Sequence, residues 1–167
     1  MSPTCDLLAV NERQALEFFA LGLRDVSDAS VDRDELLYNA SVLAHYAQVS
    51  TASTVDLSVP ANLSDVFDQF VASDTAPRDS LHMEMAAAQC LLLAGFFEDQ
   101  MRQRHNIRWY AQLGATFFSR AAVQSTSAKR ARLLDALSHS FEAWRRRHSN
   151  LSRELREQAR LLNGGRP

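Results

Sequence analysis

The sequence predicts an all-α fold, an irregular bundle of six or seven helices around one central apolar helix at about residues 80–97. Glycine (5) and proline (4) are rare among the 167 residues, which favours long helices over the turn-rich connections of a β sandwich. The segment MAAAQCLLLAGFF at 85–97 carries no charge. It is shorter than the roughly 20 apolar residues that span a bilayer. We therefore expect no membrane contact, but a helix that is apolar on all sides because other helices surround it.

Three helices are expected before this central one. The first follows Asn11, a good N-cap, and runs to about Arg24 with apolar residues at i, i+3 and i+7. The second follows Asp32 and reaches about residue 50, with Glu35 three residues after the cap as in a capping box. A short third helix is expected after Pro60. Its apolar face comprises Leu63, Val66, Phe67, Phe70 and Val71.

A further helix is expected after the central one, because Tyr110, Leu113 and Phe117 recur at helical spacing. Gly114 interrupts this helix, at a cost of about 1 kcal/mol relative to alanine. A glycine at this position indicates that a second helix crosses closely.

An apolar row with alternating spacings of three and four residues follows from Leu134 to Leu162, a heptad register typical of a coiled coil. Residues 126–162 form either one long helix or two, with a break at 148–150. We expect a single helical domain at 1–147, a basic heptad extension at 148–162 and a tail at 163–167. The predicted self-association seam comprises Leu137, Phe141, Trp144, His148, Leu151, Leu155 and Leu162.

Charge is distributed unevenly along the chain. The net charge is −2, but residues 1–128 contain 8 Arg and 16 Asp and Glu, whereas residues 129–167 contain 10 Lys and Arg and 4 Asp and Glu. Such a basic segment can contact nucleic acid or an acidic protein. Glu142, Glu154 and Glu157 are interleaved with the arginines, which favours a salt-bridged helix over a nucleic-acid contact. The candidate anion or nucleic-acid contacts are Arg145, Arg146, Arg147, Arg153 and Arg156.

Motifs for catalysis, metals and cofactors are missing from the sequence. It contains no Gly-x-Ser-x-Gly elbow, no glycine-rich phosphate loop and no pair of Glu-x-x-His motifs. Neither Cys5 nor Cys90 has a second ligand at zinc spacing, and Cys90 lies in the apolar segment as a packing residue. We therefore assign no catalytic, cofactor or metal residues and lean towards a non-enzyme. A pocket near His105, Trp109 and Tyr110 is the weaker alternative.

The N-terminal sequence has neither the basic region nor the apolar run of a signal peptide, so we expect a cytoplasmic protein with reduced cysteines. Arginine outnumbers lysine 17 to 1, which indicates a GC-rich, bacterial genome.

Two segments carry a resemblance. CLLLAGFF at 90–97 followed by WYAQLGATFF at 109–118 resembles an uncharacterised family of bacterial all-helical proteins, in which an apolar helix ends in Gly-Phe-Phe and a tyrosine pair precedes Leu-Gly. Here Trp109 and Tyr110 replace the tyrosine pair. The resemblance covers roughly residues 63–125 and implies an all-helical fold. It carries no functional residues.

These features favour a non-enzymatic adaptor or regulatory protein that associates with other proteins and forms a homodimer through its C-terminal helix. The alternative is a nucleic-acid-binding regulator that uses the arginine-rich helix. An acidic protein partner is also compatible with this helix.

Overall fold

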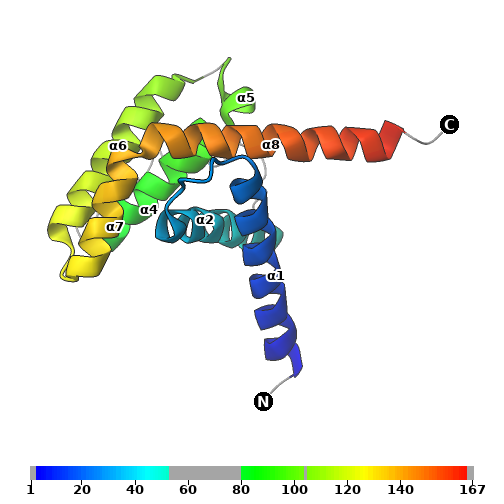
Figure 1. The fold of residues 1–167 in the computed structure, drawn as a ribbon, viewed down its shortest axis with the longest axis horizontal. Coiled ribbons are helices and arrows are strands. Elements are labelled where there is room, and N and C mark those ends of the chain that lie inside the picture. Colours follow the sequence, from blue (N-terminus) through cyan, green and yellow to red (C-terminus); the bar gives the residue numbers. More distant parts are fainter. Residues whose placement is uncertain (1–2, 53–79, 104, 165–167) are drawn as a thin grey trace.

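The computed structural model describes residues 3–52, 80–103 and 105–164, and every regular element in these ranges is helical, which confirms the predicted fold class (Figure 1). The predicted helix after Pro60 lies outside the described residues. The elements are α1 (Pro3–Asp25), α2 (Arg33–Ala52), α4 (Ser80–Leu91), the π-helix η1 (Leu92–Phe96), α5 (Glu98–Met101), α6 (Ile107–Gln124), α7 (Ala128–His139) and α8 (Phe141–Gly164).

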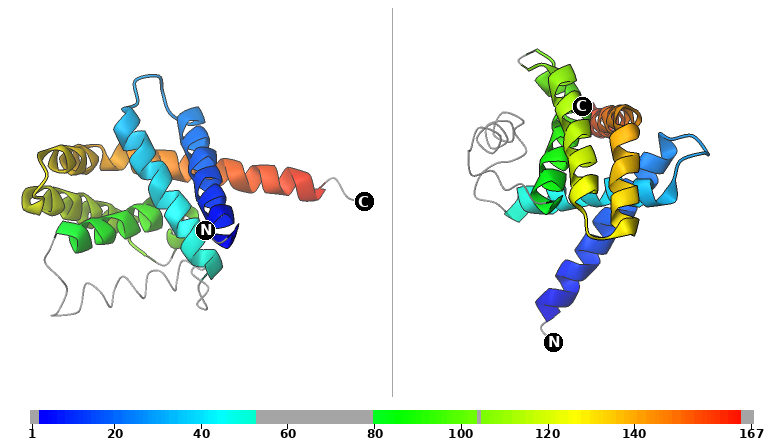
Figure 2. Two further views of the ribbon diagram at one scale, coloured as in Figure 1. Left: turned by 90° about the horizontal axis from the view of Figure 1, so that it is seen from below. Right: turned by 90° about the vertical axis from the view of Figure 1, so that its left-hand side faces the viewer.

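The predicted central helix is confirmed as α4 and its π-helical continuation η1. Residues 90–95 are all buried, and small side chains at Ala86 and Ala87 let neighbouring helices approach. α4 packs along α6, η1 packs against α8, and Figure 2 shows α4, α6 and α7 side by side. A Cβ added at Gly114 would lie 2.7 Å from Cys90 Cβ and 2.5 Å from Phe141 Cζ. The close helix crossing predicted at Gly114 is therefore confirmed.

The N-terminal helices α1 and α2 pack against each other and contribute Leu23 and Leu43 to the core. Asp32 caps α2, because its Oδ1 accepts from the Glu35 amide at 3.0 Å. The Glu35 side chain does not complete a capping box. Its carboxylate accepts hydrogen bonds from Trp144 Nε1 at 3.1 Å and from Ser140 Oγ.

The C-terminal segment forms two helices, and the break lies at Ser140 instead of at 148–150. Ser140 leaves the helical conformation (φ −97°, ψ 13°), and its hydroxyl donates to Ala136 O and to Glu35. The chain thus changes direction between α7 and α8 at a residue that bonds to Glu35, 105 positions away in the sequence. α8 continues through the predicted boundary at 147–148, so the first turns of the predicted extension belong to the core.

α1 and α8 cross each other beside the rest of the bundle. Beyond the crossing, the two helices project from the bundle in different directions (Figures 1 and 2). A Cβ at Gly22 would lie 2.8 Å from Leu151 Cδ1, which places the crossing at these two residues. The N-terminal part of α1 and the C-terminal part of α8 therefore form two arms that diverge from one corner.

Candidate interaction surface and its charged clamp

The apolar row of the C-terminal helices is divided between the core and the surface. Five of its predicted seam residues are buried in the core of their own chain, so in this conformation they cannot contact a second molecule. They are Leu137, Phe141, Trp144, His148 and Leu151. Heptad spacing predicts a buried face but not which molecule covers it, and here the chain's own core covers these five residues.

The end of the row has a different environment. Leu155 is half-buried against the core, whereas Leu162 is 81% exposed and its neighbour Leu161 is 68% exposed. We call residues 157–164 the C-terminal arm. Every residue of this arm is exposed, although the arm remains helical.

Three arginines of α8 face an acidic group that follows η1, namely Arg145, Arg153 and Arg156. Arg145 is the most enclosed of them, with its side chain 12% exposed. It donates to Glu98 at 2.8 Å and to Glu142 at 2.6 Å, and its Nη1 also donates to Ala94 O at 3.2 Å. In a π-helix each amide reaches back five residues, as Phe97 N does to Leu92 O at 2.9 Å. Arg145 thus satisfies a buried carbonyl within this widened turn.

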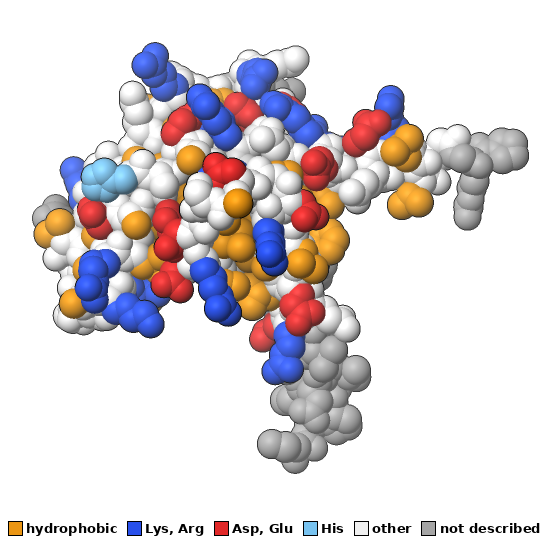
Figure 3. All heavy atoms as spheres, in the orientation of Figure 1, with side chains coloured by type: hydrophobic (Ala, Val, Ile, Leu, Met, Phe, Trp, Pro, Cys, Tyr) orange, Lys and Arg blue, Asp and Glu red, His pale blue; other side chains and the backbone are white. Residues whose placement is uncertain are grey.

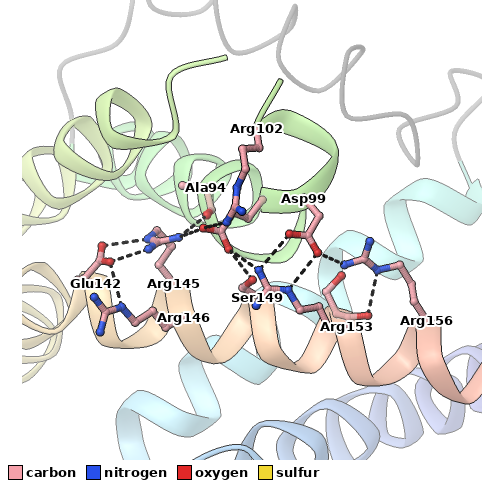
Figure 4. A network of polar contacts seen from close by, with 11 residues as sticks. Ala94, Asp99, Arg102, Glu142, Arg145, Arg146, Ser149, Arg153 and Arg156 are labelled. Atoms are coloured by element: carbon pink, nitrogen blue, oxygen red, sulfur yellow. Dashed lines mark hydrogen bonds and ion pairs between the residues drawn. The ribbon is translucent and has the colours of Figure 1, made fainter. Parts of the chain in front are cut away.

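About two to three turns further along α8, Arg153 and Arg156 contact Asp99 on the same side of the helix (Figure 4). Arg153 donates to Asp99 Oδ1 at 3.0 Å, and Arg156 donates to Asp99 Oδ2 at 2.5 Å. Ser149 Oγ donates to Glu98 Oε2 at 2.6 Å. We call Glu98, Asp99, Arg145, Ser149, Arg153 and Arg156 the charged clamp. It attaches α8 to η1 and α5 immediately before the C-terminal arm.

Both clamp carboxylates are stabilised in their ionised form. Hydrogen bonds from Arg153 and Arg156 hold the pKa of the Asp99 carboxyl far below its usual range. Burial would raise the pKa of Glu98, but hydrogen bonds from Ser149 and Arg145 outweigh it and lower the pKa. The clamp is therefore ionised at neutral pH.

Three of the five predicted anion contacts are engaged within the chain, because Arg145, Arg153 and Arg156 form ion pairs with Glu98 and Asp99. Of the other two, Arg146 is exposed and pairs with Glu142 at 3.3 Å, and Arg147 stacks over the Trp144 ring at 4.5 Å. Sequence reasoning missed the acidic half of the clamp. The available signal was the pair Glu98-Asp99 directly after the apolar helix, together with arginines at 145, 153 and 156 on one helical face.

A buried polar pair lies beneath the clamp. His148 is fully buried, and its Nε2 lies 2.9 Å from Asn39 Oδ1. Because Asn39 Nδ2 donates to Glu35 O at 2.8 Å, Oδ1 is the acceptor and His148 carries its proton on Nε2. His148 Nδ1 has no hydrogen-bond partner among the described residues. Burial lowers the pKa of His148 to about 3, so the ring is neutral at physiological pH.

A second polar cluster surrounds Glu84 of α4. Tyr38 Oη donates to Glu84 Oε1 at 2.9 Å, and Arg130 forms an ion pair with the same oxygen. Burial raises the pKa of Tyr38. Two hollows share Tyr38 and Arg130 in their walls, one of about 760 Å³ between α2 and α7 and one of about 480 Å³ between α2 and α4. Arg130 compensates the charge of Glu84.

The remaining candidate groups are Cys90 and the aromatic cluster at residues 105–110. Burial raises the pKa of the Cys90 thiol, which keeps it protonated. Trp109 and Tyr110 pack edge to face with ring centroids 4.8 Å apart, and His105 approaches Tyr110 in the same way at 6.1 Å. Over the described ranges, no group of three or more His, Cys, Asp or Glu side chains has a metal-binding arrangement. Nor does any described helix have the length and apolarity that crossing a membrane requires.

The resemblance noted at 90–97 and 109–118 depends on those two motifs alone. In comparisons with known protein families, curated proteins and solved structures, the chain matches no family model, no curated protein and no solved structure.

Proposed function

We propose that this chain is a non-enzymatic helical adaptor that self-associates through its C-terminal arm. One observation supports this most directly. A single apolar row on α8 is covered by its own core as far as Leu151, and then continues to the exposed Leu162.

The stability of the arm is the physical argument. Isolated helices shorter than about 12–15 residues are marginal in water, because tertiary packing supplies most helical stability. The arm has no such packing beyond the half-buried Leu155. Burial of a leucine that is otherwise exposed contributes about 1.5–3 kcal/mol. A partner that covers Leu161 and Leu162 would therefore stabilise both the helix and the complex.

The charged clamp supports the same proposal. Because Asp99 holds Arg153 and Arg156, the direction of α8 is determined just before the arm begins. A partner then meets an arm whose starting position and direction are already determined, which reduces the entropic cost of binding.

Nucleic-acid binding by α8 remains the second candidate, with less support. Phosphate contacts need accessible cations, and the clamp engages Arg145, Arg153 and Arg156 within the chain. Their ion pairs would have to break before phosphate could replace the carboxylates.

The proposal is tested by the molar mass of the full-length chain in solution, measured by light scattering across a concentration series. The wild-type chain is expected to form dimers, and the Leu161→Ser/Leu162→Ser variant is expected to dissociate at concentrations where the wild type remains dimeric. Val123→Ser is the matched control, because Val123 is 84% exposed but lies at the end of α6. A monomeric wild-type chain at every concentration, or equal dissociation of both variants, would refute the proposal.

A further inference from the structure

We propose that the C-terminal arm docks on α1 of a second copy of this chain, so that the two copies are related by a twofold axis and each arm covers the other copy's α1. This inference rests on the proposed self-association and specifies its partner surface.

α1 has an exposed apolar surface of its own. Phe18 is 53% exposed and Leu21 is 60% exposed, whereas Leu23 on the same helix is fully buried. The Phe18 ring packs edge to face on Phe19 with centroids 5.2 Å apart, and Phe19 is itself half-buried against the core. The aromatic pair therefore presents an apolar surface that is held in place from behind.

The two exposed surfaces cannot cover each other within one chain. α1 and α8 cross at Gly22 and Leu151, and the arm runs away from this crossing in a single continuous helix. Leu162 lies eleven residues beyond Leu151, which corresponds to about 16 Å along the helix axis. Figure 3 shows hydrophobic side chains near the corner between the two projecting helices and others near the end of α8.

The size of a stable interface favours contact with α1 over arm-to-arm contact. Stable protein interfaces typically bury about 800 Å² and involve about 20–30 residues on each partner. The arm comprises only residues 157–164, so two arms in contact would form a small interface and leave Phe18 and Leu21 exposed. In a twofold arrangement each arm-to-α1 contact occurs twice, and it covers Phe18, Leu21, Leu161 and Leu162 of each copy.

The charges beside these surfaces are compatible with this pairing. Exposed Glu17 is adjacent to Phe18, and exposed Arg160 is adjacent to Leu161. Arg160 pairs within the chain with Glu157 at 2.8 Å, but its side chain is 77% exposed and can exchange partners. Exposed Arg13 on α1 and exposed Glu154 on α8 provide the opposite combination.

Cross-linking between singly substituted full-length chains tests the pairing. Phe18→Cys, Leu162→Cys and Val123→Cys are each made in a Cys5→Ser background, in which the remaining Cys90 is buried. Two variants are mixed, allowed to exchange subunits and treated with a short bismaleimide. The mixture of Phe18→Cys with Leu162→Cys is expected to yield several-fold more covalent dimer than either variant alone. The mixture of Val123→Cys with Leu162→Cys is expected to remain at background.

The outcomes separate this inference from the proposed function. If Leu162→Cys alone cross-links as well as the mixture, the arms pair with each other, so this inference fails while self-association through the arm stands. If light scattering shows a dimer but the Phe18→Cys and Leu162→Cys mixture gives no more product than the Val123→Cys control, the pairing of the arm with α1 is overturned. The Leu161→Ser/Leu162→Ser variant then decides whether the arm contributes to the dimer interface. A monomeric chain removes both proposals.

Discussion

Arg145 of α8 donates a hydrogen bond to Glu98 at 2.8 Å, although 47 residues separate them in the chain. Both side chains are 12% exposed, and Arg145 also satisfies the Ala94 carbonyl of the π-helix. These contacts join η1 and α5 to the helix that carries the C-terminal arm. The clamp therefore holds α8 against η1 and α5 up to the point where the C-terminal arm begins.

Glu98→Gln is expected to lower the free energy of unfolding by about 2–4 kcal/mol, because breaking an enclosed ion pair leaves a charge poorly compensated. Asp99→Asn is the comparison, since the Arg153 and Arg156 side chains that it pairs with are each 47% exposed. An exposed pair contributes about 0–1 kcal/mol. Urea denaturation followed by circular dichroism measures both. Equal losses of unfolding free energy in the two variants would show that the enclosed Glu98 ion pair contributes no more to stability than the exposed Asp99 pairs.

Gly114→Ala is expected to destabilise the chain by about 1–3 kcal/mol, even though alanine gains about 1 kcal/mol in helix propensity. The new methyl group would overlap the Phe141 ring and Cys90 Cβ. Gly164→Ala adds a methyl group that meets nothing within 4 Å, so it is expected to leave stability unchanged or slightly raised. Thermal denaturation of the two variants checks the difference. A stabilised Gly114→Ala would contradict the close crossing in this structure.

Much of the fold follows from sequence periodicity, because a helix buries the side chains that recur at its own period. The central helix, the Asp32 cap and the crossing at Gly114 depend on neighbours in sequence or on one missing side chain, and they could be predicted. The break at Ser140 could not, because the SHSF sequence at 138–141 contains neither glycine nor proline and the hydroxyl of Ser140 bonds to Glu35 from a distant helix.

The candidate surface was predicted only in part, for a related reason. Spacings of three and four identify the apolar face of α8, but the position at which the core ends depends on the crossing with α1 at Gly22 and Leu151. Likewise, the arginines of α8 could be read as a cationic band from sequence. Their partners Glu98 and Asp99 belong to another helix, and only the packing of η1 on α8 brings them together.

Truncation separates the clamp from the arm. A chain ending at residue 156 loses the C-terminal arm, whose described residues 157–164 are all exposed, so the stability of its monomer is expected to change by less than about 1 kcal/mol. A chain ending at residue 147 loses buried His148 and Leu151 together with Arg153 and Arg156, and it is expected to lose several kcal/mol or fail to fold. Thermal melts followed by circular dichroism, at protein concentrations below the dissociation constant of the dimer, measure the stability of both truncated monomers. A 1–147 chain as stable as 1–156 would instead support a domain boundary at residue 147.

The buried His148 predicts a pH dependence whose direction follows from proton binding. Burial lowers its pKa in the folded chain to about 3, whereas an unfolded histidine titrates near 6.5. Between these values the unfolded chain binds more protons, so stability is fully present above about pH 6.5 and falls as pH decreases, by up to about 1.4 kcal/mol per pH unit.

His148→Gln stays neutral at every pH and retains a donor for Asn39 Oδ1, so the fall in unfolding free energy between pH 7 and pH 5 should be smaller in this variant. The clamp carboxylates, with lowered pKa values, titrate below that window. His139→Gln is the control, because the His139 side chain is 78% exposed. Chemical denaturation at pH 7, 6 and 5 provides the slopes. If His148→Gln retains the wild-type slope, protonation of another group causes the decrease, and the neutral buried imidazole does not control acid stability.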